Sequence, residues 1–119
     1  MEVITSKTDN SPLITLEEST LRISGRSYMN NAGDFYHNII DWLEFRQINS
    51  LNVVVDLEYF NTSSSKSLLE FFRWMEKKSI DGKDMKVHWQ VKPQFFEMYE
   101  AGEDYYDLLP NLDFEIVEL

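Results

Sequence analysis

The sequence predicts a small α/β domain, in which a mixed sheet carries helices mainly on one side. Segments with strand-like patterning alternate with helical segments along most of the chain. The central segment Leu51–Leu57 contains three consecutive valines without polar alternation, as in a strand that is buried on both faces. Strand–helix–strand connections of this length are crossovers, which are right-handed in nearly all known proteins.

The chain length is sufficient for one domain. A chain of 119 residues, 43% of them hydrophobic and 14% aromatic, can build one core but has no room for a second. We therefore predict a single domain over residues 1–119. Within it, residues 1–11 are expected to be irregular or to add an edge strand at Val3–Thr5.

The first half of the chain predicts a hairpin followed by a helix. Apolar and polar residues alternate at Leu13–Glu17 and again at Thr20–Gly25, with the short Glu18–Ser19 connection between them. A loop rich in Asn and Gly follows. Apolar residues then recur at helical spacing, which predicts a helix from Asp34 to about Asn49.

The second half alternates helices and strands after the Leu51–Leu57 strand. Apolar residues crowd one broad face of a helical segment that ends just before Gly82, a common position for glycine after a helix. A later helix begins after Pro93, is interrupted at Gly102 and ends before Pro110. The predicted elements are a helix at Ser64–Ile80, a strand at Met85–Val91, a helix from Gln94 to about Leu109 and a strand at Phe114–Val117.

Charge and composition exclude several functions. The formal net charge of −10 disfavours binding to nucleic acid and to anionic membrane surfaces, both of which require an excess of Lys and Arg. No apolar run approaches the roughly 20 residues of a membrane span. The N-terminal residues have neither the basic nor the apolar region of a signal peptide, and there is no cysteine. We therefore expect a cytoplasmic protein that does not insert into membranes.

The sequence offers little for catalysis. A Ser or Thr nucleophile needs a base, and the only histidines are His37, on a predicted helix surface, and His88, on a predicted strand. The Walker phosphate loop requires glycines, but none lies between Gly33 and Gly82. No metal-ligand spacing is present either. We predict no catalytic residue, no metal and no cofactor; the enzymatic alternative is a small hydrolase that pairs Ser63 or Ser64 with His88.

The predicted third helix is both acidic and rich in aromatic residues. Its carboxylates are most simply a solvated face, and most of its aromatic side chains are expected in the core. The remainder can form a patch that binds a partner protein, since aromatic residues are enriched at interfaces. A constitutive binding module that uses this helix is the second alternative. The aromatic residues are Phe95, Phe96, Tyr99, Tyr105 and Tyr106.

Four consecutive hydroxyl residues stand where the central strand becomes the second helix, in the segment "YFNTSSSK". Asn61 or Thr62 is suited to cap the helix by accepting hydrogen bonds from its first N–H groups. A helix N-terminus also favours negative charge, so a phosphate on Thr62 would be tolerated there, with Lys66 one turn further on. The same phosphate would add about −1.5 to −2 charge to an already acidic surface and repel a partner that docks on this helix end, so the segment is a candidate switch.

A valine-rich strand followed by hydroxyl residues at a helix start resembles the STAS domains, the anti-sigma-factor-antagonist fold. The match is closer to the STAS-like SiaC family of regulatory phosphoproteins. It rests on "LEYFNTSSSK", "WMEKK", "KVHWQV", "EAGEDYYDLL" and "DFEIVEL", and covers the chain from about Leu13 onward. Asn61 replaces the usual STAS Asp and no Gly follows the hydroxyls, which favours the SiaC family over sigma-factor control.

The resemblance implies a non-enzymatic regulator that is switched by phosphorylation. The phosphorylated residue of the family falls on Thr62, with Ser63 and Ser64 as secondary candidates. The resemblance further implies a Ser/Thr protein kinase, a PP2C-type phosphatase, and a diguanylate cyclase or another effector bound by the unphosphorylated form. The residues expected to contact these partners are Asn61, Thr62, Ser63, Ser64 and Lys66.

Overall fold

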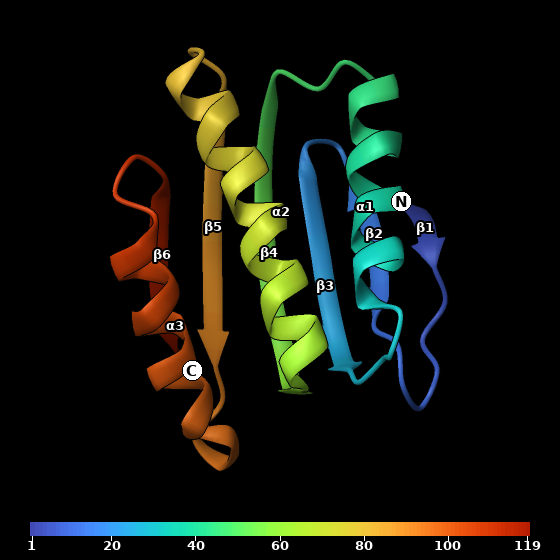
Figure 1. The fold of residues 1–119 in the computed structure, drawn as a ribbon, viewed down its shortest axis with the longest axis vertical. Helices are drawn as coiled ribbons and strands as arrows, with labels where there is room; N and C mark the ends of the chain where they lie inside the picture. Colours follow the sequence, from blue (N-terminus) through green and yellow to red (C-terminus); the bar gives the residue numbers. More distant parts are fainter.

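Six strands form one sheet in sequence order, from β1 to β6 (Figure 1). They are seen in a computed structural model that describes all residues 1–119. The first three strands pair antiparallel, and the last four pair parallel, so the sheet is mixed as predicted. The strands are β1 (Glu2–Thr5), β2 (Leu13–Glu17), β3 (Thr20–Ser27), β4 (Ser50–Phe60), β5 (Asp84–Val91) and β6 (Asp113–Glu118).

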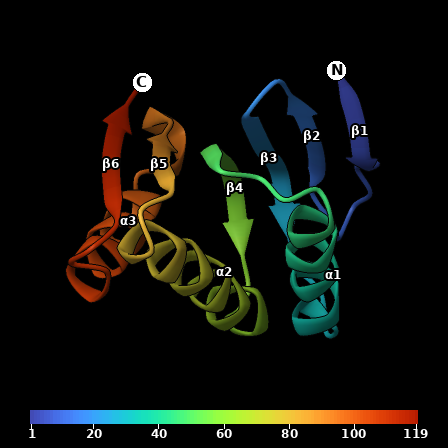
Figure 2. The ribbon, with the colours of Figure 1, turned by 90° about the horizontal axis from the view of Figure 1, so that it is seen from above.

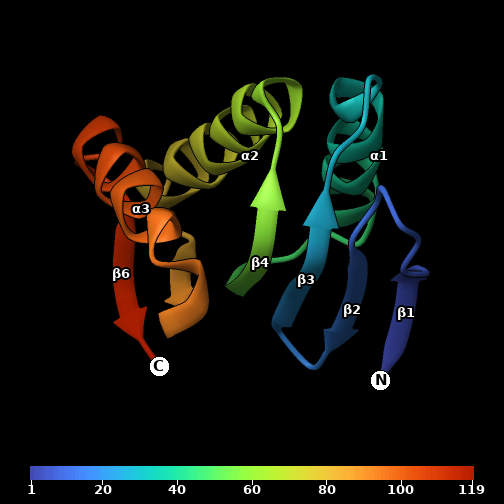
Figure 3. The ribbon, with the colours of Figure 1, turned by 90° about the horizontal axis from the view of Figure 1, so that it is seen from below.

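The three helices all cover the same face of the sheet, which confirms the predicted arrangement. They are α1 (Ala32–Phe45), α2 (Thr62–Ile80) and α3 (Glu97–Leu108), with a short 3₁₀ turn, η1 (Pro93–Phe95), before the last. Viewed along the strands, the helices lie side by side on one face of the sheet, and no element covers the opposite face (Figures 2 and 3). Right-handed crossovers between successive parallel strands produce this one-sided layering.

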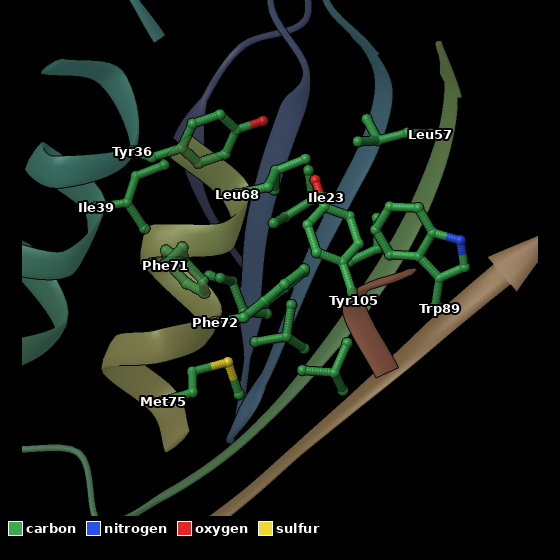
Figure 4. Close-up of a cluster of buried hydrophobic side chains, with 14 of the residues drawn as sticks. Ile23, Tyr36, Ile39, Leu57, Leu68, Phe71, Phe72, Met75, Trp89 and Tyr105 are labelled. Atoms are coloured by element: carbon green, nitrogen blue, oxygen red, sulfur yellow. The ribbon is translucent and has the colours of Figure 1, made fainter. Parts of the chain in front are cut away.

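The hydrophobic core fills the space between the helices and the sheet (Figure 4). Its aromatic part lies under α2 and α3, where Phe72, Trp89 and Tyr105 contact one another with ring centroids 5.2–6.3 Å apart. Edge-to-face packing of such rings adds to the stabilisation that their buried area provides. This cluster fixes the position of both helices on the sheet.

The central strand differs from its prediction, because β4 is not buried on both faces. Leu51, Val53 and Val55 are fully buried beneath the helices, whereas Asn52 and Val54 lie on the uncovered face and are only partly buried. Strand side chains alternate between faces, and neighbouring strands flank a central strand on both sides. The valine run therefore indicates a central position in the sheet. β4 also extends to Phe60, three residues past the predicted end.

Several helix boundaries differ from the predicted ones, and α1 begins at Ala32, two residues before its predicted start. The first helix ends at Phe45 rather than near Asn49, and Gln47 follows with a positive φ of 54° that no helix continues through. The predicted third helix divides into η1 and α3. It is not interrupted at Gly102, where the helix is continuous and packs directly on Trp89.

The N-terminal residues adopt the second of the two expected forms, because Glu2–Thr5 pairs with β2 as an edge strand. The hairpin turn at Glu18–Ser19 is present as predicted, with Glu18 at a positive φ of 56°. None of the helices is long and apolar enough to cross a membrane.

Candidate functional site at the start of α2

The hydroxyl segment lies at the carboxyl edge of the parallel strands. β4 ends at Phe60, Asn61 caps the helix, and α2 begins at Thr62, two residues before its predicted start. Ligands and partners of open α/β sheets bind preferentially at this edge, because strand ends and helix starts present exposed backbone there. The predicted site therefore lies at the edge where ligands of such sheets usually bind.

Asn61 is the cap residue that the sequence suggested. Its extended backbone and its side chain satisfy the helix start, because its Oδ1 accepts a hydrogen bond from the Ser64 N–H at 2.9 Å. Its Nδ2 donates to the Met29 carbonyl at 3.1 Å, which fixes the side chain. The N–H groups of Thr62 and Ser63 occupy the first helical positions, where no intrahelical acceptor exists.

Ser64 is fully buried and serves packing. The Ser27 hydroxyl, at the end of β3, donates to Ser64 Oγ at 2.7 Å and lies 2.8 Å from the Tyr36 hydroxyl of α1. Burial raises the pKa of Tyr36 well above its ordinary value, so its hydroxyl stays protonated and can donate within this chain. The three hydroxyls tie the start of α2 to β3 and α1.

Ser65 makes the corresponding connection to α3. The Tyr105 hydroxyl donates to the Ser65 carbonyl at 2.8 Å and lies 3.3 Å from Ser65 Oγ. Burial, which outweighs the hydrogen bond to Ser65, raises the pKa of Tyr105 to about 12. Ser64, through Ser27, and Ser65 thus connect the start of α2 to tyrosines of the two neighbouring helices.

Thr62 and Lys66 remain at the surface, one turn apart. Thr62 is exposed, Ser63 is partly exposed, and Lys66 has no carboxylate within ion-pair distance. The structure therefore brings Asn61, Thr62, Ser63 and Lys66 together at one accessible helix start, and places Ser64 beneath it. An anion on Thr62 would meet the free N–H groups of the first turn and the positive end of the helix dipole.

The hydrolase alternative requires His88 near Ser63 or Ser64, but the fold separates them. Trp89 and its alternate neighbours on β5 point toward the helices, so His88 points toward the uncovered face of the sheet. Ser64 lies on the helix-covered face. No group of three or more His, Cys, Asp and Glu side chains is placed to hold a metal ion.

Sequence reasoning missed a cavity beside the hydroxyl segment. A cavity of about 640 Å³ lies at the carboxyl edge, where the exposed rings of Tyr28 and Tyr59 are 5.7 Å apart. Tyr59 precedes Thr62 by three residues, so their Cα atoms lie within about 11 Å of each other. Between Gly25 and Arg26 the β3–β4 register shifts, so that Arg26 pairs with Tyr59. The alternation of residues along a strand does not reveal such a shift, so the position of Tyr59 beside Tyr28 could not be predicted from it.

A mixed six-stranded sheet covered on one face by three helices defines the class: a small one-sided α/β domain. A family model described as SiaC family regulatory phosphoprotein matches residues 5–119, and the chain belongs to this family. This match confirms the predicted family. Because the family is described as one of regulatory proteins, the match also agrees with the expectation of a non-enzymatic protein.

Several solved structures share the fold. The chain is similar to one in the crystal structure of the diguanylate cyclase SiaD in complex with its activator SiaC from Pseudomonas aeruginosa, with 23% identity, a TM-score of 0.84, and coverage of 95% of this chain and 96% of that one. SiaC of the same organism gives 22% identity and a TM-score of 0.81, covering 98% and 97% of the two chains.

A curated relative matches over a shorter part of the chain. An uncharacterized protein of Pseudomonas aeruginosa strain UCBPP-PA14 is 26% identical over 88 residues, which cover 71% of this chain and 70% of the relative. At these identities the solved structures establish the shared fold, and the family model carries the assignment.

Proposed function

We propose that this protein is a phosphorylation-controlled regulator whose switch is Thr62, and that its unphosphorylated form binds and activates a diguanylate cyclase. The observation that carries the proposal is the separation of the four hydroxyls: Thr62 is exposed at the helix start, whereas Ser64 is buried. A kinase can reach Thr62 in the folded domain. It cannot reach Ser64 without unfolding the first turn of α2, so Ser63 is the remaining secondary candidate.

The proposed effector follows from the similarity to the SiaC chain of the SiaD complex. SiaC is the activator of the diguanylate cyclase SiaD in that structure. Asn61, Thr62, Ser63 and Lys66 are the residues proposed to contact such a cyclase, with Ser64 supporting them from below. A dedicated Ser/Thr kinase and a PP2C-type phosphatase would set the state of Thr62.

The physical mechanism is a change of charge at an interface. A phosphate on Thr62 adds about −1.5 to −2 charge, and the helix terminus stabilises it with free N–H groups. The domain therefore keeps its fold in both states, while the surface offered to the cyclase becomes strongly anionic and bulkier. Association that depends on close contact at this helix start is weakened by repulsion and desolvation.

The first experiment maps the modified residue. The protein, Thr62→Ala and Thr62→Ser are each incubated with ATP and the cognate Ser/Thr kinase, and the sites are located by mass spectrometry. We expect a single phosphate on Thr62 in the parent protein, retention in Thr62→Ser and loss in Thr62→Ala. Equal modification of Thr62→Ala would refute the switch assignment.

The second experiment separates charge from shape. Thr62→Asp and Thr62→Asn are nearly isosteric, so a difference between them reports the negative charge alone. We expect Thr62→Asp to bind the cyclase more weakly than Thr62→Asn by calorimetry and to stimulate cyclic-di-GMP synthesis less. Circular dichroism should show the same fold for both. Equal affinities of the two variants would contradict the repulsion mechanism.

A further inference from the structure

We propose that the outer edge of β6 and the groove beside it bind an extended basic segment of a partner protein, which adds to the sheet as a seventh strand. This surface is distinct from the Thr62 site and is not required by the proposed switch. We call it the β6-edge groove and define it by Tyr99, Glu103, Tyr106, Asp107, Asp113 and Glu115.

The backbone of β6 is available for pairing. β6 is the last strand of the sheet and pairs only with β5, in regular register over six consecutive residues. The opposite edge differs, because β1 has four residues and its register shifts between Val3 and Thr5. Short and irregular strands protect an edge, whereas a regular one presents a row of free N–H and C=O groups. β6 is therefore the edge suited to receive another strand.

The groove supplies contacts for the side chains of such a strand. It has a volume of about 690 Å³ and lies between α3 and β6, with apolar residues of β6 at its base. Tyr106 on its α3 side is 58% exposed, and the Tyr99 ring stacks on Phe96 with an interplanar angle of 6°. Exposed, preordered aromatic rings beside a free strand edge are typical of interfaces, in which alternate side chains of an added strand enter pockets.

The charge of the groove selects the partner. Four acidic residues flank the β6 edge, with Glu103 and Asp107 of α3 on the helix side and Asp113 and Glu115 of β6 on the uncovered side. No cationic side chain lines the groove. The cation that reaches one of them is Lys86, whose Nζ lies 3.7 Å from Glu115. An added strand carrying Lys or Arg complements this charge. A second copy of this chain would bring the same carboxylates against themselves, which disfavours self-pairing.

The β6-edge groove lies away from the switch. β5 separates β4 from β6 in the sheet, so Thr62, which follows the end of β4, does not lie beside the free edge of β6 (Figure 1). A segment bound in the groove would hold a partner in either phosphorylation state of Thr62. The groove thus provides an anchoring contact that is independent of the switch.

The test uses a six-residue acetylated peptide that alternates lysine and valine, matching the six residues of β6. It is titrated into ¹⁵N-labelled full-length protein, with two comparison peptides: one with glutamate in place of lysine, and one with every backbone amide N-methylated. We expect amide shifts along β6 and at Tyr99 and Tyr106 for the lysine peptide only. Raising the salt from about 0.05 to about 0.5 M should weaken binding.

Matched variants locate the effect. The double variant Glu103→Lys/Asp107→Lys changes two exposed carboxylates of the groove and should weaken binding by about tenfold or more. Glu70→Lys/Asp41→Lys makes the same change of charge on α2 and α1 and should leave binding unaltered. Equal loss in both variants, shifts elsewhere than β6, or equal binding of the N-methylated peptide would each overturn the proposal. Sedimentation showing a dimer through β6 would also overturn it, in favour of a second copy.

Discussion

The four consecutive hydroxyl residues have four different environments, which explains why four of them occur together. Thr62 is exposed and Ser63 partly so, Ser64 is bonded to Ser27, and Ser65 is bonded to Tyr105. The two inner hydroxyls hold the helix start rigidly on α1, β3 and α3. The outer threonine is therefore presented on a rigid helix start. Such a position suits a residue that partner proteins recognise.

Replacement of Ser64 should affect stability, and replacement of Ser63 should not. Ser64→Ala removes the acceptor of the buried Ser27 hydroxyl and should lower the free energy of unfolding by roughly 1–2 kcal/mol. Ser63→Ala, next to it on the partly exposed surface, should change it by less than about 0.5 kcal/mol. Urea unfolding of both variants provides the comparison. Equal effects would show that the buried hydroxyl network does not stabilise the helix start.

At the scale of elements, sequence patterning identified every strand and helix but not their packing partners. Alternation gave the β2–β3 hairpin, and helical spacing gave α1 and α2, because these patterns reflect which side of an element is buried. The end of α1 was missed because no glycine or proline between Arg46 and Ser50 marks the end of the helix. Gly102 was read as an interruption, although the reason for a glycine there is a tryptophan thirteen residues earlier in the sequence.

The candidate site was predictable in part for the same reason. Asn61 and Thr62 carry a local signal, since capping depends on neighbouring residues. The separate roles of Ser64 and Ser65 depend on Tyr36 and Tyr105, which are brought to them by tertiary packing. The cavity at Tyr28 and Tyr59 depends on a shift of strand register, which no single segment reveals.

Gly102 provides a test of helix packing at the element scale. A Cβ at this position would lie 2.6 Å from Cδ1 and 2.8 Å from Nε1 of the buried Trp89, whose Nε1 donates to the Met98 carbonyl. Alanine improves helix propensity by about 1 kcal/mol. We nevertheless expect Gly102→Ala to destabilise the protein by about 1–3 kcal/mol, because α3 must move away from the sheet.

The control for this substitution is another helical glycine. Gly33 lies in the first turn of α1, and an added Cβ would make only an ordinary contact at 3.9 Å with Ser67 Oγ. Gly33→Ala should therefore leave the free energy of unfolding unchanged or raise it by up to about 1 kcal/mol. Thermal unfolding of both variants measures the difference. A stable Gly102→Ala protein would show that α3 is loosely packed.

At the scale of the whole molecule, one layer of helices covers one face of the sheet, and two buried tyrosines connect that layer at its centre. Tyr105 on α3 donates directly to the Ser65 carbonyl in the first turn of α2, whereas Tyr36 on α1 is linked to Ser64 through the Ser27 hydroxyl. On the uncovered face, Asp56 connects strands instead, with Arg22 at 2.8 Å and Lys92 at 3.4 Å. The helix layer thus depends on hydroxyl groups that must remain neutral.

This dependence predicts a loss of stability at alkaline pH. A tyrosine has a pKa of about 10 in the unfolded chain, and burial raises the pKa of Tyr105 to about 12 and that of Tyr36 further. The neutral tyrosine is therefore favoured by folding, so its contribution is fully present below pH 10 and is lost as the pH rises from 10 toward the folded pKa. The rise in the pKa of Tyr105 from about 10 to about 12 corresponds to roughly 2–3 kcal/mol of unfolding free energy lost by pH 12.

Urea unfolding between pH 8 and pH 12 should show this decline, with a shallower one in Tyr105→Phe. Tyr106→Phe, which removes an exposed hydroxyl from the neighbouring position, should retain the full decline. The same pH dependence in Tyr105→Phe and Tyr106→Phe would show that ionisation of Tyr105 does not limit stability at alkaline pH.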